Sequence, residues 1–102
     1  LRTLSGEALL LNNNQNGSIT SPVFEGTITR ITVTYTSFNG SPASLKLFEL
    51  NGSNEVEVSE STSVSGETIM TYTWTNLSLH QFKLVNKTNY IIIDNITWEV
   101  SS

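Results

Sequence analysis

The stretch GTITRITVTYT, residues 26–36, decides the fold class, because its apolar and polar side chains alternate with the period of two that a β-strand requires. Apolar residues at positions 31, 33 and 35 share one face of this strand, and threonines occupy the other. Ile28 is out of phase with that set, which predicts either a β-bulge near Arg30 or a segment buried on both faces. The pattern indicates a long strand with one face in a hydrophobic core.

Shorter segments with the same period, separated by turn residues, extend this pattern over the whole chain. Asn51-Gly52 lies between two of these segments and predicts a hairpin in which the leucines at 45 and 47 pair with the valines at 56 and 58. We therefore expect an all-β, antiparallel β-sandwich of about eight strands. Including residues 26–36, these strands cover residues 7–12, 18–21, 43–50, 55–58, 68–75, 81–86 and 90–100.

Two further segments carry specific expectations. Residues 59–66 are small and polar apart from Val64, so they predict an exposed loop. The closing segment, residues 90–100, is apolar on both parities around three consecutive isoleucines, which predicts that its middle is buried on both faces.

The composition supports a β fold and excludes several classes of protein. Ser, Thr and Asn supply 39 of the 102 residues, a bias that suits strands and turns and disfavours a helical bundle. Only five basic residues and a net charge of −4 argue against nucleic-acid binding and against contact with an anionic membrane. The apolar runs are too short to span a membrane. We expect one domain, residues 1–102, cut from a longer protein, because the chain starts at Leu1 without an initiator Met.

Three motifs resemble a known group of proteins. They are GEALLL at 6–11, GSITSPVF at 17–24 and YIIIDNITW at 90–98. In this order they resemble the jelly-roll accessory modules of secreted bacterial proteins, which include carbohydrate-binding modules and choice-of-anchor β-sandwiches. The resemblance implies jelly-roll topology and an extracellular or cell-surface module appended to a larger secreted protein. Some of these relatives bind polysaccharide, whereas others act as spacers beside a neighbouring domain.

Asp94 is the residue that points most directly to a metal. It lies in an otherwise apolar segment, where an unpaired carboxylate is costly, so it should have partners. In related jelly rolls the closing-strand Asp helps to bind a structural calcium ion with oxygens from near the first strand, which here implies Glu7. Asn95 stands where a second Asp often lies, and backbone N–H groups are the alternative partners of Asp94.

Aromatic residues are the candidates for sugar binding, because a flat ring stacks on the apolar face of a pyranose. The expected ligand-binding residues are Trp74, Tyr72 and Trp98. Trp74 is expected to be the more exposed tryptophan, because threonines flank it and its segment runs into Thr75-Asn76. The alternative is that these rings belong to the core, since each shares its parity with other apolar residues.

Catalytic groups are scarce in this sequence. His80 is the single histidine, Asp94 the single aspartate, and cysteine is absent. No nucleophile motif accompanies them, so we expect no enzyme and a solvent-facing His80. The sequence therefore predicts a non-catalytic module that binds polysaccharide or a surface glycan. The alternative is a structural spacer that contacts adjacent domains of its parent chain and has no ligand of its own.

Overall fold

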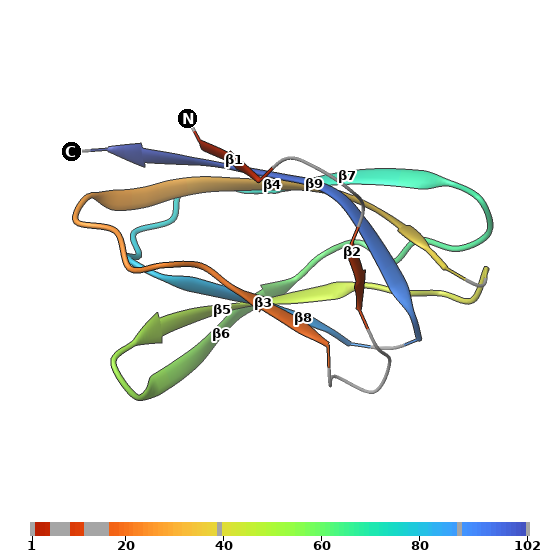
Figure 1. The fold of residues 1–102 in the computed structure, drawn as a ribbon, viewed down its shortest axis with the longest axis horizontal. Helices are drawn as coiled ribbons and strands as arrows, with labels where there is room; N and C mark the ends of the chain where they lie inside the picture. The colour runs from red at the N-terminus through yellow and green to blue at the C-terminus, as the bar shows by residue number, and fades with distance from the viewer. Residues whose placement is uncertain (1, 5–8, 12–16, 39, 88, 102) are drawn as a thin grey trace.

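The computed structural model describes residues 2–4, 9–11, 17–38, 40–87 and 89–101, with the backbone alone for the first two ranges. These residues form nine strands and two antiparallel sheets that pack face to face as a β-sandwich (Figure 1). The strands are β1 (Arg2–Leu4), β2 (Leu9–Leu11), β3 (Ser18–Thr20), β4 (Thr27–Ser37), β5 (Leu45–Asn51), β6 (Asn54–Glu60), β7 (Ile69–Trp74), β8 (Phe82–Asn86) and β9 (Ile91–Ser101). No helix long and apolar enough to cross a membrane occurs in these ranges.

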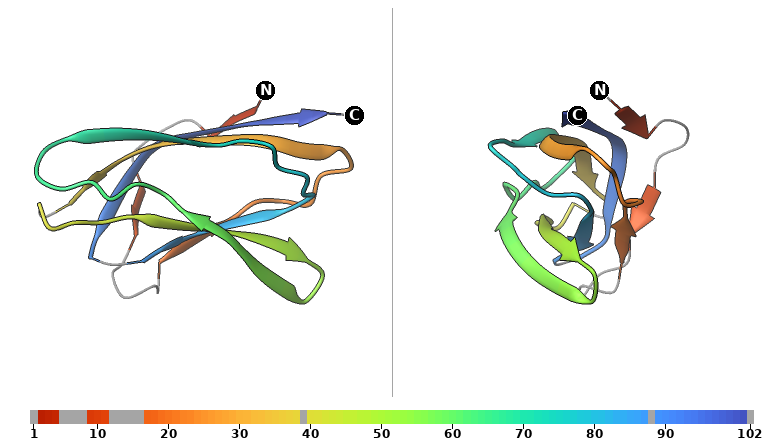
Figure 2. Two further views of the ribbon diagram at one scale, coloured as in Figure 1. Left: turned by 180° about the vertical axis from the view of Figure 1, so that it is seen from behind. Right: turned by 90° about the vertical axis from the view of Figure 1, so that its left-hand side faces the viewer.

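The two sheets differ in size. The larger has five strands in the order β1-β9-β4-β7, with β2 also paired to β9, and the smaller has four in the order β3-β8-β5-β6. From β3 onward, every connection except the β5–β6 hairpin carries the chain to the other sheet (Figures 1 and 2). The expected all-β, antiparallel sandwich is confirmed. The described ranges contain nine strands where about eight were expected, because β1 precedes the first strand that the sequence pattern predicts.

Two β-bulges shape the central pair of strands, β4 and β9. The register shifts between Ile28 and Arg30, which confirms the bulge expected near Arg30. It shifts again where Thr34 pairs with Asn95 but Tyr35 pairs with Ile93, so one residue of β9 is left unpaired. The expectation that the middle of the closing strand is buried on both faces is wrong. The second bulge, and not two-sided burial, changes the phase of its apolar residues.

The core lies between the two sheets. It is formed by inward side chains of β4, β5, β8 and β9, with Trp74 from β7 and Leu79 from the β7–β8 connection. Val64 is also in this core, exposed by only 2%, where it bridges to Ala43. The expectation of an exposed loop over 59–66 is therefore wrong in part, because Val64 and Ser61 are buried and β6 extends to Glu60.

The β5–β6 hairpin confirms the Asn-Gly turn but not the expected pairing. Asn51 pairs with Asn54 and Glu49 with Val56, and a bulge at Leu47/Phe48 follows. The leucines at 45 and 47 therefore do not pair with the valines at 56 and 58 as expected. A two-residue turn sets this register instead of a four-residue loop. The tip of the hairpin diverges from the larger sheet (Figures 1 and 2), which leaves both faces of most of β6 exposed.

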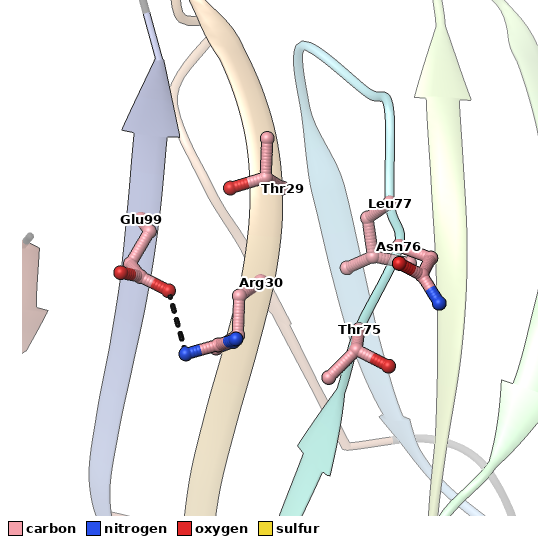
Figure 3. A pocket seen from close by; sticks show the side chains of 6 residues that line it. All are labelled: Thr29, Arg30, Thr75, Asn76, Leu77 and Glu99. Carbon is pink, nitrogen blue, oxygen red and sulfur yellow. Dashed lines mark ion pairs between the residues drawn. The ribbon is translucent and has the colours of Figure 1, made fainter.

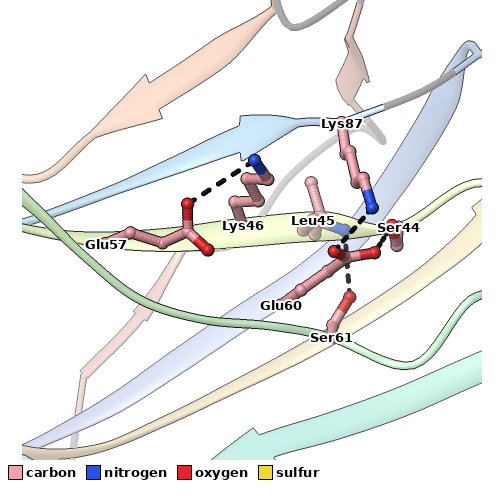
Figure 4. Close-up of polar contacts among 7 residues, drawn as sticks. All are labelled: Ser44, Leu45, Lys46, Glu57, Glu60, Ser61 and Lys87. Carbon is pink, nitrogen blue, oxygen red and sulfur yellow. Dashed lines mark hydrogen bonds and ion pairs between the residues drawn. The ribbon is translucent and has the colours of Figure 1, made fainter.

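Ion pairs connect the strands on the outer face of the smaller sheet. Lys87 lies 2.9 Å from Glu60, which also accepts a 2.7 Å hydrogen bond from Ser44 (Figure 4). These two contacts hold the pKa of the Glu60 carboxyl below its ordinary value. Lys46 pairs with Glu57 at 3.5 Å on the same face. The edge strand β6 is thus tied to its neighbours by side chains as well as by its backbone.

Candidate functional site

The three aromatic residues expected to bind a ligand project from the inner face of the larger sheet. Trp74 is 3% exposed, so the expectation that it is the more exposed tryptophan is wrong. Its register explains the burial, because it pairs with Ile31, which is completely buried. Tyr72 is partly buried beside it, with the two ring centroids 5.0 Å apart. Trp74 therefore presents no open ring face to solvent.

Trp98 is partly buried among other aromatic rings. It lies 5.9 Å from Phe24 and 6.0 Å from Phe82 between ring centroids. Its indole nitrogen is buried and has no hydrogen-bond partner among the described residues. It pairs with Ile31 from the side opposite Trp74, so both tryptophans project toward the core. Ligand contact by Trp74, Tyr72 and Trp98 stays a prediction that their packing does not favour.

Asp94 is exposed, and the second bulge explains why. It is the unpaired residue of β9 between Ile93 and Asn95, so its carboxylate is not trapped in an apolar environment. Within the described ranges, no three acidic, histidine or cysteine side chains gather into a metal-binding group. These residues by themselves do not fit a calcium ion. Glu7 lies outside the described residues, and its pairing with Asp94 at a calcium site stays a prediction.

A pair of aromatic residues, one exposed and one partly buried, lies at one end of the sandwich, on residues that we did not select from the sequence. Phe38 directly follows β4 and is 56% exposed. All nine aromatic residues of the chain lie in the described ranges, and Phe38 is the only one of them that is exposed. Tyr90 directly precedes β9 and lies 5.9 Å from Phe38, with their planes at 63°. We call Phe38 and Tyr90 the ring pair.

Hydrogen bonds connect the two loops that carry the ring pair. The Phe38 N–H donates a 3.2 Å hydrogen bond to the Tyr90 carbonyl, which joins the β4–β5 and β8–β9 connections. Asn89 donates from its side-chain Nδ2 to the Pro42 carbonyl at 2.5 Å. The buried Asn86 side chain donates in turn to the Asn89 carbonyl. These bonds fix the backbone next to both rings, so the exposed Phe38 and the partly buried Tyr90 are carried by hydrogen-bonded loops.

Backbone geometry explains why these loops contain Gly and Asn. Gly40 has φ +84° and Asn89 has φ +56°, both in the left-handed region that these two residue types tolerate best. The Gly40 carbonyl accepts a 3.0 Å hydrogen bond from Gly66 N–H, which adds the β6–β7 connection to the same end. Hydrogen bonds thus link the β4–β5, β6–β7 and β8–β9 connections at the end of the sandwich that carries the ring pair.

A polar notch lies at the opposite end of the larger sheet (Figure 3). It forms where β7 ends at Trp74 and the chain bends away at Asn76, whose φ is +57°. It has a volume of about 490 Å³. We call this hollow the notch, and it is lined by Thr29, Arg30, Thr75, Asn76, Leu77 and Glu99.

An ion pair borders the notch. The Arg30 guanidinium lies 3.2 Å from the Glu99 carboxylate, and both side chains are about half exposed (Figure 3). The first bulge of β4 places Arg30 opposite Glu99 on the outer face, one residue before the buried Ile31. Both groups keep free hydrogen-bonding positions, because a guanidinium has five N–H donors and a carboxylate about four acceptor positions.

Neutral threonines cover the outer face of the larger sheet between the two ends. Thr32 and Thr73 share a hydrogen bond of 3.1 Å between their hydroxyls, and Thr34 and Thr71 share one of 3.2 Å. These pairs follow directly from the register of β4 and β7. On β4 and β7, the middle of the outer face therefore carries ordered, uncharged hydroxyl groups.

No protein-family model matches this sequence, and no curated protein matches it. The fold, in contrast, matches solved structures. The carbohydrate-binding module CBM36, solved in complex with calcium and xylotriose, matches with a TM-score of 0.62 and 16% sequence identity. The match covers 96% of this chain and 92% of that module. The chain has the fold of a carbohydrate-binding module.

Two further modules with this fold support the assignment. TmCBM61, solved with β-1,4-galactotriose, matches with a TM-score of 0.57 and 16% identity over 92% of this chain and 69% of its own. A family 6 carbohydrate-binding module matches with a TM-score of 0.54 and 16% identity over 99% of this chain and 88% of its own. The resemblance to carbohydrate-binding modules expected from the three sequence motifs is thereby confirmed at the level of the fold.

The ring pair could have been found from the sequence by a different criterion. Alternation within strands favours the aromatic residues inside them, and these rings pack in a core. Phe38 and Tyr90 instead adjoin the turn segments at 39–42 and 86–89. An aromatic residue next to Asn and Gly at the end of a strand is the better signal for an exposed ring.

Proposed function

We propose that this chain is a non-catalytic module that binds polysaccharide or a surface glycan through the ring pair. The observation that carries the proposal is the 56% exposure of Phe38 beside Tyr90, on a loop end that hydrogen bonds brace. Covering the face of an exposed aromatic ring with a sugar removes apolar surface from water and so contributes favourably to binding. The fold supports the same reading, since the similar solved structures are carbohydrate-binding modules.

The angle between the two rings limits the shape of the ligand. Planes at 63° cannot both lie flat against one extended surface, as an array of coplanar rings would. They form a corner in which one ring stacks on a sugar and the other contacts its edge. This geometry favours a single glycan chain over the flat face of a crystalline polysaccharide.

The proposal contains no catalytic step. His80 is exposed, as expected, and its Nδ1 is 2.8 Å from the Gly26 carbonyl oxygen, to which it donates. That bond orients the ring through Nδ1 against the protein backbone. The proposal also includes jelly-roll topology, supported by the repeated changes of sheet along the chain. An extracellular setting on a larger secreted bacterial protein rests on the sequence motifs alone.

Retention on polysaccharide gels tests the proposal. The probes are xylan and β-1,4-galactan, chosen because xylotriose and β-1,4-galactotriose are the sugars in two of the similar structures. We expect at least one gel to retard the protein, and Phe38→Ala to abolish the retardation without changing the melting temperature. Val56→Ala is the matched control, because Val56 is an apolar residue with the same 56% exposure as Phe38 and lies on β6 of the other sheet, near the hairpin tip.

Two outcomes would contradict the proposal. Equal retention of the Phe38→Ala variant and the wild-type protein would remove the ring pair from the binding site. Failure of the wild-type protein to bind these gels or a broad glycan array would favour the spacer alternative. In that case the module should instead contact adjacent domains of its parent chain.

A further inference from the structure

The notch and the ring pair are the two ends of one line of side chains on β4. Side chains along this strand alternate between buried and outward-facing positions up to Phe38. Phe38 therefore continues the outward set that begins at the notch. We call the outward set the β4 track, and it consists of Arg30, Thr32, Thr34, Thr36 and Phe38.

The notch suits an uncharged ligand rich in hydroxyl groups. Arg30 and Glu99 cancel each other's charge, so the notch has no net charge to attract an ion. The guanidinium supplies donors and the carboxylate supplies acceptors, and neighbouring threonine hydroxyls and the Asn76 amide can do both. Leu77 is the single apolar side chain in the lining. Vicinal hydroxyls of a neutral sugar match this combination, because each is both a donor and an acceptor.

The β4 track is a continuous path of the same chemistry. Its middle residues are threonines, and the hydroxyls of Thr32 and Thr34 are held by their partners on β7. In each hydrogen-bonded pair of hydroxyls, one O–H donates to the other oxygen. The second O–H of the pair is left to donate to a ligand. Thr36 differs, because its hydroxyl donates to the Thr68 carbonyl at 2.7 Å and offers only acceptor capacity. The track itself carries no charged side chain between Arg30 and Phe38, and the exposed Asp94 carboxylate lies on the neighbouring strand β9, at the bulge opposite the step from Thr34 to Tyr35.

We propose that the notch is a remote saccharide subsite, and that one neutral glycan chain lies along the β4 track from the ring pair to the notch. Positions 30 and 38 are eight residues apart in extended backbone, which spans about 26 Å. A trisaccharide at the ring pair is too short to reach the notch, whereas a longer chain is not. This inference rests on the proposed function and adds a second contact to the same ligand.

The experiment measures affinity against ligand length by titration calorimetry. The probes are xylo- and β-1,4-galacto-oligosaccharides, from the trisaccharide up to the soluble polymer. For the wild-type protein we expect affinity to rise with length until the chain spans the track and then to level off. Arg30→Ala and Asn76→Gly should bind the trisaccharide normally but lose about tenfold on the long chains, equivalent to about 1.4 kcal/mol. Asn76→Gly keeps the left-handed backbone while it removes the amide.

Matched controls separate a local effect from a general one. Lys83→Ala breaks an ion pair of 2.9 Å with Glu55 on the opposite sheet, so it removes a similar surface contact without touching the track. It should leave both short-chain and long-chain binding unchanged. Thr34→Val keeps the side-chain shape and removes a hydroxyl from the middle of the track, so it should weaken long chains alone.

Each outcome discriminates between this inference and the proposed function. Wild-type affinity that does not increase beyond the trisaccharide, or notch variants that bind long chains normally, would overturn the inference and leave the proposed function standing. Absence of wild-type binding to every probe would overturn both. Phe38→Ala should lose binding at all lengths, and loss confined to long chains would contradict the ring pair as the primary contact.

Discussion

The indole nitrogen of Trp74 on β7 donates a 3.0 Å hydrogen bond to the Ser59 hydroxyl on β6. Among the described residues, β7 and β6 are the edge strands of their two sheets, and they lie on the same side of the sandwich. The bond therefore closes that side across the gap between the sheets. The same residue that the sequence suggested as a sugar platform is a structural link.

We predict that Trp74→Ala destabilises the protein. A 3% exposed Trp leaves a large cavity on truncation, which typically costs about 3–5 kcal/mol. Chemical denaturation should show a lower midpoint, and any loss of glycan retention should follow the fraction of unfolded protein. Ser59→Ala removes only the hydrogen bond and should cost about 1 kcal/mol. A Trp74→Ala variant with wild-type stability would contradict the burial of this ring.

A second prediction concerns the support of the ring pair. Asn89→Gly preserves the left-handed backbone at this position and removes the side-chain bond to the Pro42 carbonyl. We expect weaker glycan retention with at most about 1 kcal/mol loss in stability, because the bond orients exposed loops and not the core. Asn54→Gly at the hairpin tip is the control and should retain full binding. Unchanged retention by Asn89→Gly would show that the loops hold the rings without this bond.

The stability contributed by Glu60 should depend on pH. Lys87 and Ser44 hold the pKa of this carboxyl below its ordinary value, so the folded state favours the ionised form. The contribution is therefore present above the ordinary pKa and is lost as the pH falls through the lowered one. Its size should be less than about 1 kcal/mol, because the pair is partly exposed to solvent.

Glu60→Gln measures this contribution. The variant should be less stable than the wild-type protein near neutral pH, and urea unfolding curves of the two should converge in acid. Added salt should reduce the difference at neutral pH, since it screens exposed ion pairs. A difference that persists below the lowered pKa would assign the effect to packing and not to charge.

We predict that Gly26→Ala is destabilising for a steric reason. A Cβ atom at this position would lie 2.3 Å from the Ser101 carbonyl oxygen and 2.7 Å from a methyl group of Val100. The start of β4 and the end of β9 would have to separate, at a cost of about 1–3 kcal/mol. Thermal unfolding measures the cost, with the exposed Ser65→Ala as control. An unaltered melting temperature would mean that the end of β9 moves away from position 26 without a measurable cost in stability.

The sequence predicted the class of fold, because alternation over the long strand 26–36 survives any error at its ends. It also located the bulge near Arg30, where a single isoleucine falls out of phase. The second bulge was missed, since three consecutive isoleucines mask the change of phase around Asp94. That bulge turns the carboxylate to solvent and removes the reason to expect partners for it.

The candidate site was less predictable than the fold. Parity shows which side chains share a face, but it does not show which face meets the other sheet at the end of a strand. Trp74 was expected to be exposed because of its threonine neighbours, yet those threonines lie on the outer face and Trp74 on the inner one. The ring pair depends on loops from distant parts of the chain, which local patterns do not bring together.

The divergence of the β5–β6 hairpin from the larger sheet has a practical consequence for engineering. Its tip, from Asn51 to Asn54, is exposed and lies outside the core. Backbone that buries nothing tolerates inserted sequence well. A peptide tag or a fluorophore-labelled loop placed there would report on the module while both ends of the β4 track stay unmodified. The hairpin thus provides an attachment point through which the protein could be immobilised or followed in solution.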